Sequence, residues 1–299
     1  AKRALLIAAS GAHNLLFTGL PRTGKTLLAS RLPGLLPALN EQEALEVATI
    51  YSVASHKPLQ HWPQRPFRQP HHSASGPALV GGGSRPQPGE ITLAHQGVLF
   101  LDELPEFDRK VLEVLREPLE SGQIIIARAR DRVRFPARFQ LVAAMNPCPC
   151  GYLGDPSGRC RCSADQVQRY RGKLSGPLLD RIDLHHTVAR ETTSLQALPV
   201  PGEDSATVAR KVAAARQQQM QRQGCANAQL DLAGLRQHCH LSQEDQHWLE
   251  QACERLNLSL RAAHRLIKVA RTLADLEATP NIQRQHLAEA LQYRPSALP

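Results

Sequence analysis

A phosphate-loop pattern near the start of the chain constrains the fold more than any other feature. Eight consecutive residues match G-x-x-x-x-G-K-[ST]: Gly19, Leu20, Pro21, Arg22, Thr23, Gly24, Lys25 and Thr26. The apolar run 14–18 before them predicts a buried strand, and the segment 25–36 predicts a helix. Loop NH groups and the helix N-terminus then converge on one anion, which predicts binding of a nucleoside triphosphate.

The residue types in this loop suit the phosphates and the metal of such a nucleotide. Gly19 and Gly24 let the backbone approach the phosphates without a Cβ in the way. Lys25 is expected to reach the terminal phosphates, and the Thr26 hydroxyl is expected to bind Mg²⁺. A Gly/Pro turn that holds a lysine by chance is the alternative, but the flanking strand and helix favour the nucleotide site.

Composition and charge narrow the class of protein. With 299 residues, of which 42% are hydrophobic and 21% charged, the chain is long enough for two globular domains. The formal net charge of +9 favours polyanionic partners, although nucleotide binding accounts for part of it. Without a run of eighteen apolar residues or a secretory signal, a cytoplasmic protein with no membrane contact is expected. The start at Ala1, inside a helical pattern, predicts that an upstream segment has been removed.

The first two thirds of the chain alternate between predicted strands and helices, which is typical of a parallel sheet in an α/β fold. Further strands are predicted at 97–101 and 139–145, with a helix at 108–120. The Pro-, His- and Gly-rich stretch 58–89 is too long for an ordinary connection, so we expect a functional insert there.

A linker at Pro199, Pro201 and Gly202 separates this region from a helical one. Beyond it, apolar residues recur with a period of about 3.6, which predicts helices. The segments concerned are 204–223, 242–255, 259–277 and 283–293. We therefore expect a small all-helical second domain.

The strand 98–101 ends in two carboxylates, Asp102 and Glu103. Ligands of open α/β sheets bind at the carboxyl ends of the strands. Asp102 is expected to hold Mg²⁺ through water, and Glu103 to orient and deprotonate the water that attacks the γ-phosphate. Helix caps and solvated strand ends show the same pattern, but the phosphate loop upstream favours hydrolysis.

Two other polar residues are candidates for the same chemistry. Asn146 follows the strand 139–145 and can hydrogen-bond the attacking water or the γ-phosphate, although Asn146-Pro147 also suits a simple turn. Arg181 lies among apolar residues and can reach the nucleotide of a neighbouring subunit as an arginine finger. From the residues alone, a structural pair between Arg181 and Asp183 is equally compatible.

Four of the seven cysteines have metal-ligand spacing. They form C-x-C, nine residues, C-x-C, and such thiolates can close a structural tetrahedral zinc site: Cys148, Cys150, Cys160 and Cys162. Four free thiols are the alternative, because the pairs are one residue tighter than the common knuckle. Cys225, Cys239 and Cys253 fall in predicted helices and are interpreted as core or surface thiols. The pairs at 71–72 and 185–186 are histidines without ligand spacing to these cysteines, and they are interpreted as local polar contacts.

Two segments have the composition of a nucleic-acid contact. Residues 123–138 predict a hairpin before the strand 139–145, with four arginines towards its tip: Arg128, Arg130, Arg132 and Arg134. A solvated hairpin edge is the alternative, but arginine in place of lysine suits phosphate contacts. The second segment is a flexible insert that can approach a sugar-phosphate strand: Gly81, Gly82, Gly83, Ser84 and Arg85. Only 4% of residues are aromatic, so base stacking is not the expected grip.

These motifs together resemble the ComM/YifB family of magnesium-chelatase-like AAA+ ATPases, in the helix-two-insert group. The resemblance covers essentially the whole chain and rests on eight segments: 11–16, 70–75, 79–83, 88–91, 101–107, 144–147, 174–177 and 269–275. It implies a homo-hexameric motor that hydrolyses ATP with Mg²⁺ and drives branch migration of DNA. Incoming single strands would thereby integrate during natural transformation.

The resemblance also assigns residues by position. Asn146 becomes the sensor of the γ-phosphate, and Arg181 the finger supplied in trans. Arg261 occupies the second-sensor position, and Arg265 is the neighbouring candidate. Arg128 falls where related ring motors place a basic hairpin tip in the central pore, and the loop from Gly81 to Arg85 matches the second pore insert.

Two departures accompany this resemblance. Relatives usually carry glycine where this chain has Arg22, and a Cβ disfavours positive φ, so the geometry or affinity of the loop is expected to differ. The amino-terminal Lon-protease-like domain of the family is absent from this chain.

The expected organisation is an AAA+ core at 1–198 and a helical lid at 199–299. The core includes the helix-two insert, a hairpin before the sensor strand and a zinc loop at 148–162. A chelatase-type motor subunit and a Lon-like protein-remodelling ATPase are the alternatives. Basic pore residues favour DNA, since rings that thread protein generally use an aromatic and hydrophobic grip.

Overall fold

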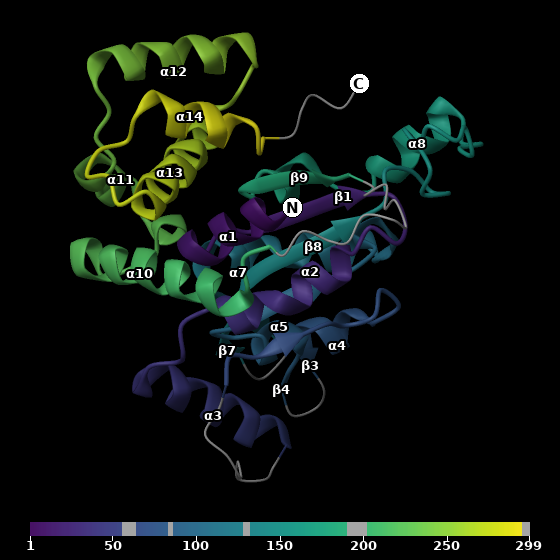
Figure 1. Ribbon diagram of the computed structural model, residues 1–299. Coiled ribbons are helices and arrows are strands. Elements are labelled where there is room, and N and C mark those ends of the chain that lie inside the picture. Colours follow the sequence, from purple (N-terminus) through teal and green to yellow (C-terminus); the bar gives the residue numbers. More distant parts are fainter. Residues whose placement is uncertain (56–63, 83–85, 128–131, 190–201, 295–299) are drawn as a thin grey trace.

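Residues 1–55, 64–82, 86–127, 132–189 and 202–294 are described by the computed structural model of the chain. Five strands form one sheet in the order β2 (Phe67–Arg68), β5 (Val98–Leu101), β8 (Gln140–Met145), β1 (Leu15–Gly19) and β9 (Leu184–Val188) (Figure 1). Neighbouring strands in this sheet are all parallel, which confirms the predicted α/β class. The predicted strands at 14–18, 97–101 and 139–145 match β1, β5 and β8 to within one residue.

Successive side chains of the strands enter two cores, one on each face of the sheet. Phe17 and Phe100 belong to the core under α1 (Lys2–Gly11), α2 (Lys25–Arg31) and the helices of the carboxyl-terminal part. Leu16 and Leu99 belong to the other core, under helices of the middle of the chain: α4 (Gly76–Val80), α5 (Glu90–Leu93), α6 (Arg109–Val114), α7 (Arg116–Ser121), α8 (Ala164–Arg171) and α9 (Gly176–Leu179). Burying one such Leu or Phe contributes about 1.5–3 kcal/mol, so both faces hold the sheet in place.

The described residues 202–294 contain helices and no strand, as predicted. They form α10 (Ser205–Gln223), η3 (Asn227–Gln229), α11 (Leu232–His238), α12 (Gln243–Arg255), α13 (Leu260–Leu276) and α14 (Arg284–Leu291). Asp204, Ser242 and Ser259 each accept a hydrogen bond from a backbone NH in the first turn of the helix that follows. These caps fix where three of the helices begin.

A buried polar network joins α13 to the end of α1. The Thr272 hydroxyl lies 2.8 Å from His13 Nε2 and accepts from Asn227 Nδ2 at 3.0 Å. Asn227 also donates to Asp275 at 2.8 Å. A Cβ on Gly11 would lie 2.4 Å from the Thr272 oxygen, so only glycine fits there. The segments 11–16 and 269–275, far apart in the sequence, therefore meet in one structural unit.

Two predicted helices differ from expectation because of proline. The helix predicted at 25–36 ends at Arg31 and continues as a short 3₁₀ turn, η1 (Leu32–Leu35), which contains Pro33. The helix predicted at 108–120 is broken into α6 and α7, since Pro118 has no NH to donate to the carbonyl of residue 114. The helix α3 (Glu41–Ser55) and the strands β2 and β9 were not predicted.

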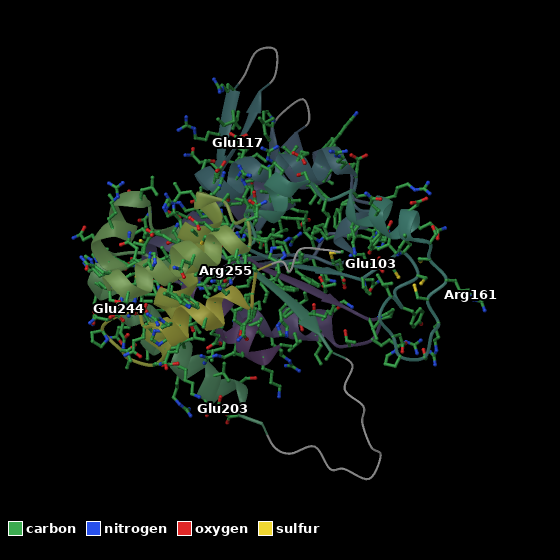
Figure 2. All side chains as sticks on the ribbon, turned by 90° about the horizontal axis from the view of Figure 1, so that it is seen from above. Glu103, Glu117, Arg161, Glu203, Glu244 and Arg255 are labelled. Carbon is green, nitrogen blue, oxygen red and sulfur yellow. The ribbon has the colours of Figure 1, made fainter. Side chains whose placement is uncertain are left out.

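Two antiparallel hairpins lie together beside the core. The predicted hairpin 123–138 is confirmed as β6 (Gln123–Ala127) and β7 (Arg132–Pro136), and a shorter one forms from β3 (Gly81–Gly82) and β4 (Gln87–Pro88). A Cβ on Gly81 would lie 3.0 Å from Ile126 Cδ1, so the two hairpins touch. In Figure 2 the longer hairpin projects from the body beyond Glu117. Five candidate residues at the tips lie outside the described residues: Gly83, Ser84, Arg85, Arg128 and Arg130.

None of the helices among the described residues is both long enough and apolar enough to span a bilayer.

Candidate nucleotide site and cysteine cluster

The phosphate loop follows β1 at the carboxyl-terminal ends of the parallel strands, here called the carboxyl edge of the sheet, and α2 begins directly after the loop. Gly24 precedes the helix with φ 80°, a left-handed conformation that glycine adopts without cost. Arg22 has φ 62°, so it takes the left-handed conformation in spite of its Cβ. This conformation places strain of about 1–2 kcal/mol in the loop.

Lys25 lies in the centre of this loop and is only 7% exposed. Its ammonium group donates to the carbonyl oxygens of Gly19 and Leu20, both at 2.8 Å, and lies 3.3 Å from Asn146 Oδ1. Burial lowers the pKa of Lys25, and the negative charges of Asp102 and Glu103 oppose this. The lysine and the predicted sensor asparagine thus share one place at the ends of β1 and β8.

The predicted ligands of Mg²⁺ also lie together. The Thr26 hydroxyl donates to Asp102 Oδ2 at 2.7 Å, and Asp102 Oδ1 accepts from the Glu103 backbone NH at 2.9 Å. A hydroxyl and a carboxylate are oxygen ligands of the kind that Mg²⁺ prefers. Glu103 is half exposed, and its side chain caps no helix.

His72 is a neighbour of Glu103 that sequence reasoning missed. Its Nδ1 lies 3.2 Å from Glu103 Oε2, whereas His71 makes the local contact that was predicted, with the Ser73 hydroxyl at 2.8 Å. The segment after β2 reaches Glu103 because β2 pairs with β5, which ends just before Asp102. A strand of two residues carries no periodic signal, so this adjacency was invisible in the sequence.

Arg181 lies at the amino-terminal ends of the parallel strands, whereas the phosphate loop lies at their carboxyl-terminal ends. It precedes β9, and its carbonyl accepts from the side chain of Asn14, which precedes β1. The five residues of β1 therefore separate the Arg181 backbone from the phosphate loop of its own chain by about 16 Å. The structure does not bring Arg181 to Lys25 and Glu103 of the same chain.

The guanidinium group of Arg181 is 5% exposed and is held by Glu120 at 2.5 Å and by the Pro177 carbonyl at 2.6 Å. The alternative pair of Arg181 with Asp183 is wrong, because Asp183 pairs with Arg265 at 2.6 Å. Burial alone raises the pKa of Asp183, but the hydrogen bond from His13 and the charge of Arg265 bring it well below its usual range.

The second-sensor candidates join Arg181 at this edge. Arg261, at the start of α13, bonds the other oxygen of Glu120, and Arg265 donates to the Arg181 carbonyl at 3.1 Å. The hydrogen bond from Arg181, followed by that from Arg261, lowers the pKa of Glu120. These three residues, named the arginine cluster below, are Arg181, Arg261 and Arg265.

The four cysteines of the predicted zinc loop converge on one point. Sulfur atoms of Cys148, Cys150 and Cys160 lie 3.4–3.7 Å apart, and all four sulfurs, with Cys162, lie within 4.8 Å of one another. A tetrahedral zinc site with Zn–S bonds of about 2.3 Å needs sulfurs about 3.8 Å apart, so the donor set fits zinc. Figure 2 shows these sulfurs near Arg161.

Backbone NH groups stabilise the thiolate form of one of these cysteines. Hydrogen bonds from the NH groups of Tyr152 and Arg161 lower the pKa of Cys150 to about 6. The three other cysteines are placed apart from the cluster: Cys239 is buried in the core, and Cys225 and Cys253 are half-buried. The division of the cysteines into two groups agrees with the sequence analysis.

A parallel sheet with a phosphate loop at its carboxyl edge, followed by a helical part, defines a P-loop protein of the AAA+ class. The family model described as magnesium chelatase, subunit ChlI, matches residues 1–196, and that of the ChlI C-terminal part matches residues 202–294. The chain therefore belongs to the magnesium-chelatase-like family.

Within this family the chain is similar to uncharacterized protein YifB of Escherichia coli, at 55% identity, and to competence protein ComM of Haemophilus influenzae, at 56%. Each alignment covers 98% of this chain and 58% of the relative, so the chain spans less than two thirds of their length. The magnesium-chelatase 38 kDa subunit of Chlorobaculum parvum is 31% identical over 108 residues, or 36% of this chain and 25% of that protein.

Proposed function

We propose that the chain is the ATP-hydrolysing part of a cytoplasmic, homo-hexameric DNA motor that drives branch migration. Such a motor would promote the integration of single-stranded DNA by homologous recombination during natural transformation. The similarity to a competence protein supports the proposed role in natural transformation. The observation that carries the proposal is the split site, with the phosphate loop at one edge of the sheet and the arginine cluster at the other.

Each residue of the carboxyl edge has one task in hydrolysis. The loop backbone and Lys25 would bind the phosphates of ATP, and Thr26 with Asp102 would hold Mg²⁺, which would supply positive charge to the phosphates. Glu103 takes the proton of the attacking water, and His72 holds the carboxylate of Glu103 in place. Asn146 orients the γ-phosphate from beside Lys25.

The arginine cluster completes the site of a neighbouring subunit. Arg181 is the finger in trans, and Arg261 is the second sensor beside it, with Arg265 fixing the Arg181 backbone. Subunits that meet edge to edge in this head-to-tail way close into a ring when their rotation permits it. We propose an AAA+ core at 1–198 and a lid at 199–299 as its two domains.

The two touching hairpins are proposed as the DNA contact in the central pore. Arg132 and Arg134 are exposed on β7, and the further DNA candidates are Arg128, Arg130 and the loop of β3 and β4, from Gly82 to Arg85. The β3–β4 hairpin contacts the arginine-bearing hairpin through Gly81. Both segments would therefore face one sugar-phosphate strand together.

Charge reversal at Arg128 and Arg130 is expected to weaken single-stranded DNA binding and to abolish DNA-stimulated hydrolysis. Each lost phosphate contact lowers the slope of log affinity against log salt by about 0.7. Fluorescence anisotropy across a salt series and the ATPase rate with and without DNA measure both effects. Reversal of Arg236 and Arg255, exposed on the lid, is the control for net charge. If the DNA affinity and the DNA-stimulated ATPase rate of the wild type did not change with salt, a chelatase-type motor subunit or a Lon-like remodelling ATPase would be favoured instead.

A structural zinc ion is proposed at the cysteine cluster. One zinc per chain is expected by elemental analysis, with loss of the metal in Cys160→Ser and full retention in Cys253→Ser. Chelation is expected to lower the melting temperature by roughly 4–8 °C, which corresponds to about 2 kcal/mol in a chain of this size. A wild-type chain that carries no zinc after loading would leave the four groups as free thiols.

A further inference from the structure

The cysteine cluster lies against the phosphate loop. Gly151, which directly follows Cys150, has φ 85°, and a Cβ built on it would lie 2.6 Å from Pro21 Cγ and 3.0 Å from Pro21 Cδ. Real Cβ atoms essentially never approach another atom so closely, so only glycine lets the two loops touch here. The same Cβ would lie 3.8 Å from Asn146 Cγ, the side chain beside Lys25.

The cysteines determine where Gly151 lies. The Gly151 NH donates to the Cys148 carbonyl at 3.0 Å, which closes the turn that carries Cys148 and Cys150. The Cys148 sulfur is buried and accepts from the Leu153 NH at 3.3 Å. The turn that carries Cys148 and Cys150 therefore fixes the backbone of Gly151. The second pair, Cys160 and Cys162, ties this turn to the start of α8.

The phosphate loop is strained at the residue next to this contact. Pro21 precedes Arg22, whose left-handed backbone is unfavourable for a residue with a Cβ. Strained backbone of this kind persists only where the surrounding structure over-determines it. Gly151 packs against Pro21, directly before the strained residue.

We propose that the metal-bound cysteine loop is a positioning element of the nucleotide site, in which Gly151 braces Pro21 and holds the strained phosphate loop in its binding conformation. Metal occupancy at the four thiolates then regulates nucleotide affinity, without any cysteine touching the nucleotide. This inference rests on the proposed nucleotide and zinc sites. It adds that the two sites are coupled through one contact between their backbones.

The first test compares two alanine variants by calorimetric titration of the zinc-loaded chain with ADP. Gly151→Ala and Gly154→Ala carry the same left-handed backbone cost, with φ 85° and 83°, but nothing lies within 4 Å of a Cβ on Gly154. Gly151→Ala is expected to raise the Kd for ADP about tenfold or more. Gly154→Ala is expected to stay within about twofold of the wild type.

A second substitution separates bracing from general damage. Pro21→Ala removes both atoms that the new methyl group meets, so the Gly151→Ala/Pro21→Ala double variant is expected to bind ADP within about threefold of Pro21→Ala alone. A merely structural role of Gly151 would shift the melting temperature and show no such rescue. In the ATPase assay, Gly151→Ala is expected to raise KM for ATP about tenfold with kcat changed less than about twofold.

The effect of the metal on nucleotide affinity is tested with the wild type and with Gly151→Ala. Chelation is expected to raise the wild-type Kd for ADP about tenfold, reversibly on return of zinc, and to change that of Gly151→Ala much less. Equal affinities in the two alanine variants, or a wild-type Kd unaffected by chelation, would overturn the coupling while leaving the nucleotide site intact. A wild type that binds no ADP in any metal state would instead overturn the proposed function itself.

Discussion

Glu103→Gln is expected to lower the steady-state ATPase rate by about 10²–10⁴-fold while leaving ATP bound. The amide keeps the shape of the side chain and its contact with His72, which lies 3.2 Å from the carboxylate, but it cannot accept the proton of the attacking water. Phosphate release under saturating ATP measures the rate, and a fluorescent nucleotide measures the affinity.

Glu106→Gln is the matched control for Glu103. Glu106 is an exposed carboxylate three residues further on, where it pairs with Lys173 at 3.3 Å and takes no part in the proposed chemistry. A hydrolysis rate close to wild type is expected for this variant. If the two variants lost activity equally, the loss would come from the charge of the segment, and Glu103 would not be the base.

Arg181→Ala is expected to lower the ATPase rate of the assembled protein by about 10³-fold or more, the usual magnitude for an arginine finger. The distinguishing result comes from mixing it with Lys25→Ala, because each variant alone lacks a different half of the site. In an equal mixture, about a quarter of the interfaces join an intact phosphate loop to an intact finger. Hydrolysis should therefore reappear at about a quarter of the wild-type rate.

The mixture also controls for misfolding. Arg181 is buried against Glu120, so its removal can destabilise the chain, but a misfolded subunit could not restore activity to Lys25→Ala. Arg116→Ala, in the same helix as Glu120 and paired with Glu113 at 2.7 Å, should keep the wild-type rate. Absence of recovery at every mixing ratio would show that Arg181 does not act on the neighbouring nucleotide.

The sequence predicted the carboxyl edge of the sheet well because its signals are local. Apolar runs that are directly followed by Gly19, Asp102 and Asn146 define β1, β5 and β8. Because these strands are parallel, their carboxyl-terminal ends lie together. The spacing of the four cysteines likewise predicted a convergence that the sulfur distances confirm. These features need only short-range periodicity and the general geometry of parallel sheets.

Features that depend on tertiary contacts were not predictable. β9 contains His185 and His186 and lacks the apolar run of a buried strand, so its partner role to β1 was missed. Glu120 is one charge among several on α7, and nothing local marks it as the partner of Arg181 and Arg261. The contact of Gly151 with Pro21 joins residues 130 positions apart (151 − 21 = 130) and leaves no pattern in either segment.

The strand β1 connects the phosphate loop at one of its ends to the backbone of Arg181 at the other. Its carboxyl end carries the phosphate loop, and Asn14, just before its amino end, bonds the Arg181 carbonyl and Asp183. A hydrogen-bonded strand in the middle of a sheet is stiff along its axis, so a push at one end arrives at the other with little loss. In a closed circle of subunits, each such strand would act as a rod that reports the state of one nucleotide to the next.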